Sequence, residues 1–191
     1  MSNGYRLIFW GLLFILIDLR LGPLDILPDF IGYIFILNGI KSLSARETLF
    51  EKARPLAMLL IVLAFPNFMG AWEINLTEGP IAVFPMVYQF VLSILHLLLI
   101  YFIFDATYRY AKENRDEFWA KAARVRWNYY AVIHLIYLAL NSFMFNVSFN
   151  VFQAVYILIM ITILIIEIVI IVFMKKSEAR SNLWGSSVDD D

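Results

Sequence analysis

Cysteine is absent from this chain of 191 residues, and only 16% of its residues are charged. Without cysteine the chain can form neither a disulfide nor a thiolate metal site, and it has no cysteine nucleophile. A net charge of -1 provides no overall basic field that would attract nucleic acid. The sequence also has no HExxH, GxSxG, Walker A or dinucleotide-binding glycine motif. These absences exclude nucleic-acid binding and several enzyme classes, and they leave an unfamiliar intramembrane enzyme open.

Apolar residues dominate what is present. They make up 62% of the chain, and the mean hydropathy is +0.75, whereas soluble domains are roughly 45 to 50% apolar. A helix that crosses the hydrocarbon core needs about 20 mostly apolar residues. Six segments approach that length, at roughly 4–20, 26–42, 55–72, 81–104, 128–146 and 151–174. The sequence therefore predicts an all-α integral membrane protein with six transmembrane helices in a single domain, residues 1–176.

The basic residues lie on one side of the predicted membrane. Fourteen of the 15 lysines and arginines, all except Arg20, fall at the N-terminus, in the two loops around 41–54 and 105–127, or after the last span. Short cytoplasmic loops carry an excess of such residues. We therefore expect both termini in the cytoplasm. The polar tail at 177–191, which ends in three aspartates, is expected to be a disordered cytoplasmic tail.

The longer basic loop, 105–127, has apolar residues at helical spacing, with basic residues off that stripe. This pattern predicts an amphipathic surface helix, which either lies among lipid headgroups or contacts a membrane protein partner. SARE (Ser44 to Glu47) and NRDE (Asn114 to Glu117) have the capping-box spacing or its asparagine variant, and each predicts a helix start.

Glycines recur seven residues apart in the first two predicted helices. Gly4 and Gly11 lie on one face of the first, and Gly32 and Gly39 lie on one face of the second. Small residues allow membrane helices to approach closely. The sequence therefore predicts a tight hairpin of these two helices.

The corner of that hairpin, IDLRLGPLDILPDF (Ile17 to Phe30), carries three aspartates and an arginine. Asp25 and Asp29 fit a helix start, where a carboxylate caps the backbone or favours the dipole. The competing interpretation is an acidic corner of Asp18, Asp25 and Asp29 that holds a cation, with Arg20 as the residue that weakens it. The sequence alone leaves both readings open.

The segment DILPDFIGYIFILNGIKSL resembles a stretch of small uncharacterised membrane proteins of Gram-positive bacteria, in which an LPDxIGY-like corner opens the second helix. The resemblance covers about residues 15–43. It implies a location in a bacterial plasma membrane, and it carries no activity with it.

A few strongly polar residues fall inside the predicted spans, where polar groups are costly and usually paired. His96, His134 and Glu167 lie at similar depths, about 9 to 12 Å from the cytoplasmic ends at 1.5 Å per residue. Gln89 and Asn141 share helix faces with the two histidines. These five residues form a candidate intramembrane polar cluster. It would join the helices by hydrogen bonds, relay a proton or, as a lesser alternative, hold a divalent metal.

No cofactor is predicted. The function that the sequence favours is a non-enzymatic accessory or interaction protein of the plasma membrane, docking through the cytoplasmic face 105–127. The alternatives are a binding or transport subunit for a small molecule or ion, and an intramembrane enzyme that depends on a metal or a proton.

Overall fold

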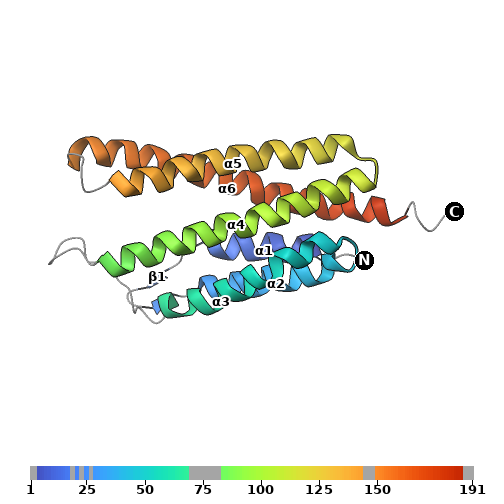
Figure 1. Cartoon of the computed structure of the whole chain (residues 1–191), viewed down its shortest axis with the longest axis horizontal. Helices are drawn as coiled ribbons and strands as arrows, with labels where there is room; N and C mark the ends of the chain where they lie inside the picture. Colours follow the sequence, from blue (N-terminus) through green and yellow to red (C-terminus); the bar gives the residue numbers. More distant parts are fainter. Residues whose placement is uncertain are drawn as a thin grey trace.

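The computed structural model describes residues 4–17, 20–21, 24–25, 28–68, 83–143 and 149–186. Six α-helices run roughly along one axis (Figure 1): α1 (Gly4–Leu16), α2 (Asp29–Ser44), α3 (Arg54–Phe68), α4 (Val83–Glu113), α5 (Glu117–Phe143) and α6 (Phe149–Ser186). A 3-10 helix, η1 (Thr48–Ala53), joins α2 to α3. Two short strands, β1 (Arg20–Leu21) and β2 (Leu24–Asp25), pair antiparallel between α1 and α2.

The prediction of six transmembrane spans is wrong. Among the described residues, only α4 and α6 contain helical segments that are both long and apolar enough to cross a membrane, at Phe84–Glu113 and Ala154–Trp184. The helices α1, α2 and α3 have 13, 16 and 15 residues, or about 20 to 24 Å, against a hydrocarbon core of about 30 Å. The 27-residue α5 is long, but charged residues interrupt its first half. The chain is all-helical, with two candidate spans.

Several helix boundaries also differ from the predicted ones. The amphipathic surface helix does not form as a separate element, because its residues are divided between the end of α4 and the start of α5 by a turn at 114–116. Arg115 in that turn has a positive φ of 56°, a left-handed conformation that is common after a helix end. The α6 helix continues to Ser186, so residues 177–186 are helical where a disordered tail was predicted.

The glycine hairpin is confirmed. An added Cβ at Gly11 would lie 2.5 Å from the carbonyl oxygen of Gly32, and one at Gly39 would lie 2.6 Å from that of Gly4. The two helix backbones therefore approach so closely that a methyl group would not fit between them. Buried Ile8 and Ile36 fill the space on either side.

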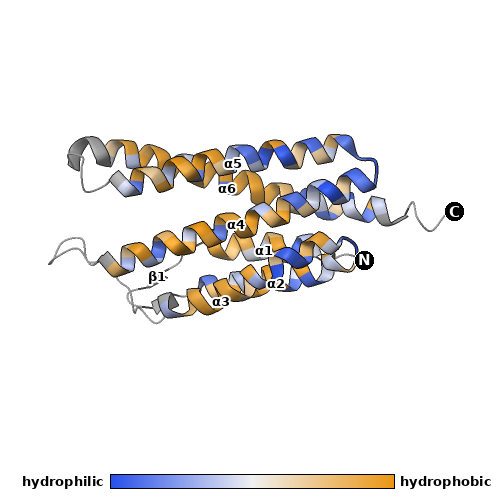
Figure 2. Ribbon diagram, in the orientation of Figure 1, coloured by the Kyte–Doolittle hydropathy of each residue, from blue (hydrophilic) through white to orange (hydrophobic). Residues whose placement is uncertain are grey.

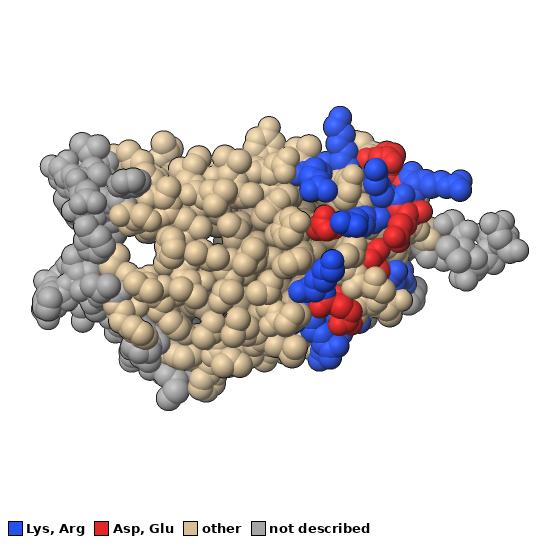
Figure 3. Space-filling view, in the orientation of Figure 1, with Lys and Arg blue, Asp and Glu red and all other residues tan. Residues whose placement is uncertain are grey.

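Charged side chains gather at one end of the molecule (Figure 3), here named the charged end. The helices α1, α3 and α5 begin there, and α2, α4 and α6 end there (Figure 1). Contacts tie these helix ends together: Tyr5 of α1 donates to Thr107 of α4, and Arg46 donates to Tyr110 and to the carbonyl oxygen of Ser181. The one-sided distribution of basic residues in the sequence thus corresponds to one end of the fold.

The helices consist mostly of apolar residues away from the charged end (Figure 2). Many large apolar side chains are exposed on α3 to α6, and we name these residues the apolar belt: Val62, Phe65, Val91, Ile94, Leu98, Val132, Leu135, Ile157, Leu158, Ile161, Leu164 and Ile165. A contiguous apolar surface of this kind is typical of a membrane or protein contact.

Candidate functional site: a polar cluster between four helices

Five polar side chains from four helices meet in the interior of the bundle. They are Tyr33 of α2, His96 of α4, Tyr130 and His134 of α5, and Glu167 of α6, and we name them the polar cluster. The three ionisable residues that the sequence placed at one depth, His96, His134 and Glu167, therefore lie together. Their helices bring them together because α5 packs against both α4 and α6.

His134 is the residue whose geometry is most informative. Its Nδ1 atom lies 3.0 Å from the backbone carbonyl oxygen of Tyr130. A carbonyl oxygen only accepts hydrogen bonds, so Nδ1 carries a proton and donates it. The other ring nitrogen, Nε2, lies 3.5 Å from Oε1 of Glu167.

This arrangement places His134 and Glu167 where they can share a proton. In the neutral tautomer with a protonated Nδ1, the bare lone pair of Nε2 would face a carboxylate oxygen, and the two would repel. The contact is favourable when Nε2 is protonated, which gives an imidazolium and carboxylate pair, or when Glu167 is a neutral acid that donates to Nε2. The pair is therefore suited to binding one exchangeable proton.

Tyr130 supports the carboxylate side of this pair. Its hydroxyl donates to Oε1 of Glu167 at 2.9 Å, and its ring lies 3.9 Å from the ring of His134, centroid to centroid. Tyr130 is completely buried. A buried charge is costly unless it is paired and hydrogen-bonded, and Glu167 has both kinds of partner here.

His96 and Tyr33 form the other half of the cluster. The Tyr33 hydroxyl and His96 Nδ1 are 3.0 Å apart, and their rings meet edge to face. His96 is also close enough to Glu167 and His134 for electrostatic interaction with both. The cluster thus connects the α1 to α4 half of the molecule with α5 and α6 through ionisable groups.

The remaining candidates lie elsewhere. Gln89 is seven residues before His96 and Asn141 seven after His134, which is about 10 Å along a helix. The Asn141 amide donates to the carbonyl oxygen of Tyr137 in its own helix. Of the acidic corner, Asp18 lies outside the described residues. The backbones of Arg20 and Asp25 are paired across the two strands, and Asp29 is the first residue of α2. Pro28, rather than Asp25, occupies the N-cap position of α2.

Within the described part of the chain, no three His, Asp or Glu side chains come together in a way that could hold a metal ion. His96, for which a metal was only a lesser alternative, contacts the Tyr33 hydroxyl, and Glu167 contacts His134 and the Tyr130 hydroxyl. The hydrogen bond and the ion pair between these groups are suited to proton binding and proton transfer.

The sequence did not identify Tyr33 as a member of the cluster. Its signal was present: Tyr33 lies nine residues before the predicted end of the second span at 42, and His96 lies eight residues before the predicted end of the fourth span at 104. A count of depth along α2 would have found it. Asp116 was also missed, although it caps α5 and binds Arg180 and Trp184 at the charged end.

No protein-family model matches the chain, and neither a curated protein nor a solved structure matches it.

Proposed function

We propose that this chain is a non-enzymatic, proton-responsive integral membrane protein of a bacterial plasma membrane, in which α4 and α6 cross the bilayer. The observation that carries the proposal is the contact between His134 Nε2 and Glu167 Oε1, which brings the two groups close enough to share a proton inside an apolar helix bundle. Ionisable groups at membrane depth often mark proton and ion pathways. The exposed apolar belt supports the membrane location, and the one-sided basic residues support a cytoplasmic charged end.

Proton gain or loss at the polar cluster acts on helix packing. The cluster is shared by α2, α4, α5 and α6, and the ionisable groups that face Glu167 are Tyr33, His96, Tyr130 and His134. Asp29, about one helical turn before Tyr33 in α2, adds a further charge that acts on Tyr33. When the proton between His134 and Glu167 leaves, the attraction between α5 and α6 weakens. The population of two helix arrangements then depends on pH.

The shared proton is measurable by nitrogen-15 NMR, because the chain has only two histidines. We expect His134 Nε2, in the full-length protein in lipid nanodiscs at pH 7, to give the signal of a protonated or strongly hydrogen-bonded nitrogen. In Glu167→Gln the signal of a protonated Nε2 should be lost, because the amide can donate a hydrogen bond to Nε2 but can neither transfer a proton to it nor pair with an imidazolium. His96→Gln assigns the two residues, and Glu178→Gln, at the charged end, is the matched control. An Nε2 that is neither protonated nor hydrogen-bonded in the unsubstituted protein would contradict the proposal.

The response to pH is measurable by spin labels, since the chain has no cysteine of its own. Labels on cysteines placed at Lys41 of α2 and Lys121 of α5, both exposed, report the separation of the two helices. We expect the distance distribution to differ between pH 5 and pH 8, and to be the same at both in Glu167→Gln. An unchanged distribution in the protein with an intact Glu167 would argue against a proton-responsive function.

A second candidate function is that of an accessory protein that docks through the charged end. Phe118, at the start of α5, is 74% exposed beside charged residues, and a large apolar side chain in that setting favours a protein contact. Under this function the polar cluster only joins the helices. Native mass spectrometry of the protein, extracted from its host with partners retained, would detect the docked subunit.

A further inference from the structure

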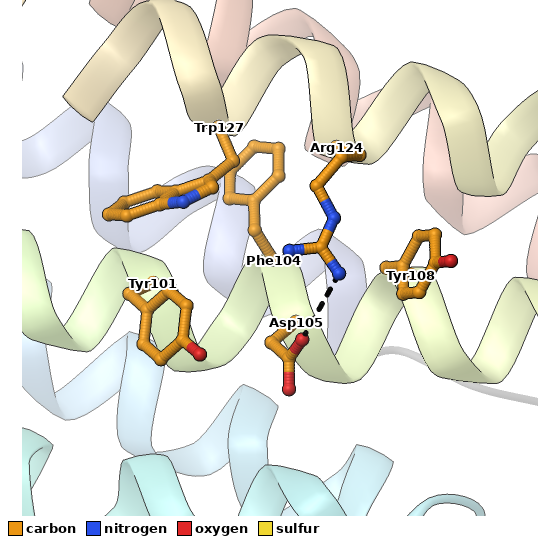
Figure 4. A pocket seen from close by; sticks show the side chains of 6 residues that line it. All are labelled: Tyr101, Phe104, Asp105, Tyr108, Arg124 and Trp127. Atoms are coloured by element: carbon orange, nitrogen blue, oxygen red, sulfur yellow. Dashed lines mark ion pairs between the residues drawn. The ribbon is translucent and has the colours of Figure 1, made fainter. Parts of the chain in front are cut away.

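A shallow hollow lies between α4 and α5, apart from the polar cluster. Six side chains line it: Tyr101, Phe104, Asp105, Tyr108, Arg124 and Trp127. Figure 4 shows Arg124 of α5 reaching toward Asp105 of α4, with the aromatic rings of Tyr101 and Trp127 on one side and Tyr108 on the other. The centroids of Tyr101 and Trp127 are 5.2 Å apart. The hollow sits where the apolar belt meets the charged end, because Leu98 precedes it on α4 and Arg109 follows it.

Cations outnumber anions around this hollow. The Asp105 carboxylate forms two ion pairs, with Arg109 Nε at 3.3 Å and with Arg124 Nη2 at 3.7 Å. The Arg124 guanidinium lies over the ring of Tyr108, 4.4 Å from its centroid, and the Lys112 ammonium lies 5.7 Å from the same centroid. Asp105 thus pairs with two arginines, and a third cation, Lys112, lies over the ring of Tyr108. A guanidinium has five N–H donors, and Arg109 and Arg124 are both about half exposed, so donors remain that can reach an added anion.

An apolar stripe continues from the hollow along α4. Val91, Ile94 and Leu98 are exposed, and they lie at the three- and four-residue spacing that leads on to Tyr101, Asp105 and Tyr108 on the same helix face. Tyrosine and tryptophan at the level of Tyr101 and Trp127 are typical of a membrane and water interface. The surface therefore presents cations above and a strip of hydrocarbon below.

We propose that the α4 and α5 hollow binds one anionic phospholipid, with its phosphate on Arg124 and Arg109 and an acyl chain along Val91, Ile94 and Leu98. Charge complementarity selects this occupant, since an excess of cations over one carboxylate favours a headgroup with a net negative charge. The inference rests on the membrane location in the proposed function, and it is independent of the polar cluster.

The test is native mass spectrometry of the full-length protein in detergent, titrated with phosphatidylglycerol or phosphatidylcholine. We expect retention of phosphatidylglycerol in preference to phosphatidylcholine. Arg124→Gln should weaken phosphatidylglycerol binding about fivefold, because one cation near the headgroup is removed. Asp105→Asn should strengthen it, because the carboxylate that repels the phosphate is neutralised. Changes in opposite directions cannot come from misfolding.

The matched control is Arg6→Gln, which removes another exposed arginine that pairs with a carboxylate at the charged end. It should bind phosphatidylglycerol as the unsubstituted protein does. Equal retention of the two lipids, or an equal loss in Arg6→Gln and Arg124→Gln, would overturn the inference. Displacement of the lipid by inorganic phosphate alone would make this a site for free phosphate and would overturn it as well. If the protein is embedded in vesicles but shows no lipid preference, the inference fails while the membrane location stands.

Discussion

Gly39 packs directly against the backbone of α1, with no room for a side chain at its position. A Cβ at this position would lie 2.6 Å from the carbonyl oxygen of Gly4 and 2.7 Å from Cγ1 of Ile8. The nearer atom belongs to the backbone of α1, so it cannot turn away as a side chain can. The same holds at Gly11, whose added Cβ would lie 2.5 Å from the carbonyl oxygen of Gly32. Two residues in each helix thus determine how closely α1 and α2 approach.

Gly39→Ala should lower the free energy of unfolding by about 1 to 3 kcal/mol, because overpacking forces the two helices apart. The gain in helix propensity from alanine, about 0.5 to 1 kcal/mol, acts in the opposite direction and is smaller. Unfolding of the purified protein in detergent, by heat or by SDS, measures the change. Ser42→Ala, at an exposed position of the same helix, is the control. Equal stability of the two variants would show that α1 and α2 are not in close contact.

A single capping residue, Asp116, binds the start of α5 to the end of α6. Its Oδ1 accepts from the backbone N–H of Trp119 at 3.1 Å, which caps α5. Its Oδ2 accepts from the indole of Trp184 at 3.1 Å and from the Arg180 guanidinium, both on α6. One buried carboxylate therefore fixes the start of α5 to the end of α6. These contacts explain why α6 continues past the predicted boundary at 174. The last turns of α6 pack on the turn at 114–116 instead of extending into water.

Asp116→Asn should lower stability by about 1 to 3 kcal/mol at pH 7, because it removes the charge that Arg180 and the α5 N-terminus bind. The Arg180 guanidinium holds the pKa of the Asp116 carboxyl below its usual range. The stabilisation is therefore present above the unfolded-state pKa of about 3.9 and is lost as pH falls through the lower folded-state pKa. The difference in stability between the two proteins should shrink below about pH 4. Unfolding at pH 7 and at pH 3 measures this.

Glu117→Gln provides the neighbouring control, since Glu117 is exposed and lies one residue further along the chain. It should retain the stability difference between pH 7 and pH 3 that the unsubstituted protein has. A loss of stability in Asp116→Asn that is the same at both pH values would mean that the carboxylate charge is not what binds α6.

At the scale of the whole molecule, charge and apolar surface are separated along the long axis (Figures 2 and 3). Leu158 and Leu183 lie on the same helix, α6, and are 67% and 60% exposed. Leu158 belongs to the apolar belt, whereas Leu183 lies at the charged end beyond Arg180. The two leucines are therefore a matched pair for testing which part of the molecule is in the bilayer.

Leu183→Cys should react with a water-soluble maleimide in reconstituted vesicles, and Leu158→Cys should not, because lipid covers the apolar belt. In detergent-free intact spheroplasts with an impermeant reagent, Leu183→Cys should react only after lysis, since positively charged ends stay in the cytoplasm. Equal labelling of the two cysteines in vesicles would refute the membrane location. Labelling of Leu183→Cys before lysis would show that the charged end faces the outside of the cell.

The sequence by itself determined the helical class, the one-sided placement of basic residues and the close approach of the first two helices. Each of these depends on composition or on a spacing within a single segment, such as the seven residues between Gly32 and Gly39. The depths of His96, His134 and Glu167 were also readable, because depth is a count along one helix. That count did not reach Tyr33, since no strongly polar neighbour drew attention to it.

Only the tertiary structure decided which helices are long enough to cross a membrane, where α5 begins and which nitrogen of His134 carries a proton. The turn at 114–116 divides an apolar spacing that reads as continuous in the sequence, and Asp116 makes the turn stable by contacts with residues more than 60 positions away. The proton on His134 follows from the Tyr130 carbonyl oxygen on one side of the ring and Glu167 on the other. Such contacts depend on which helix faces meet, and local sequence patterns do not specify that.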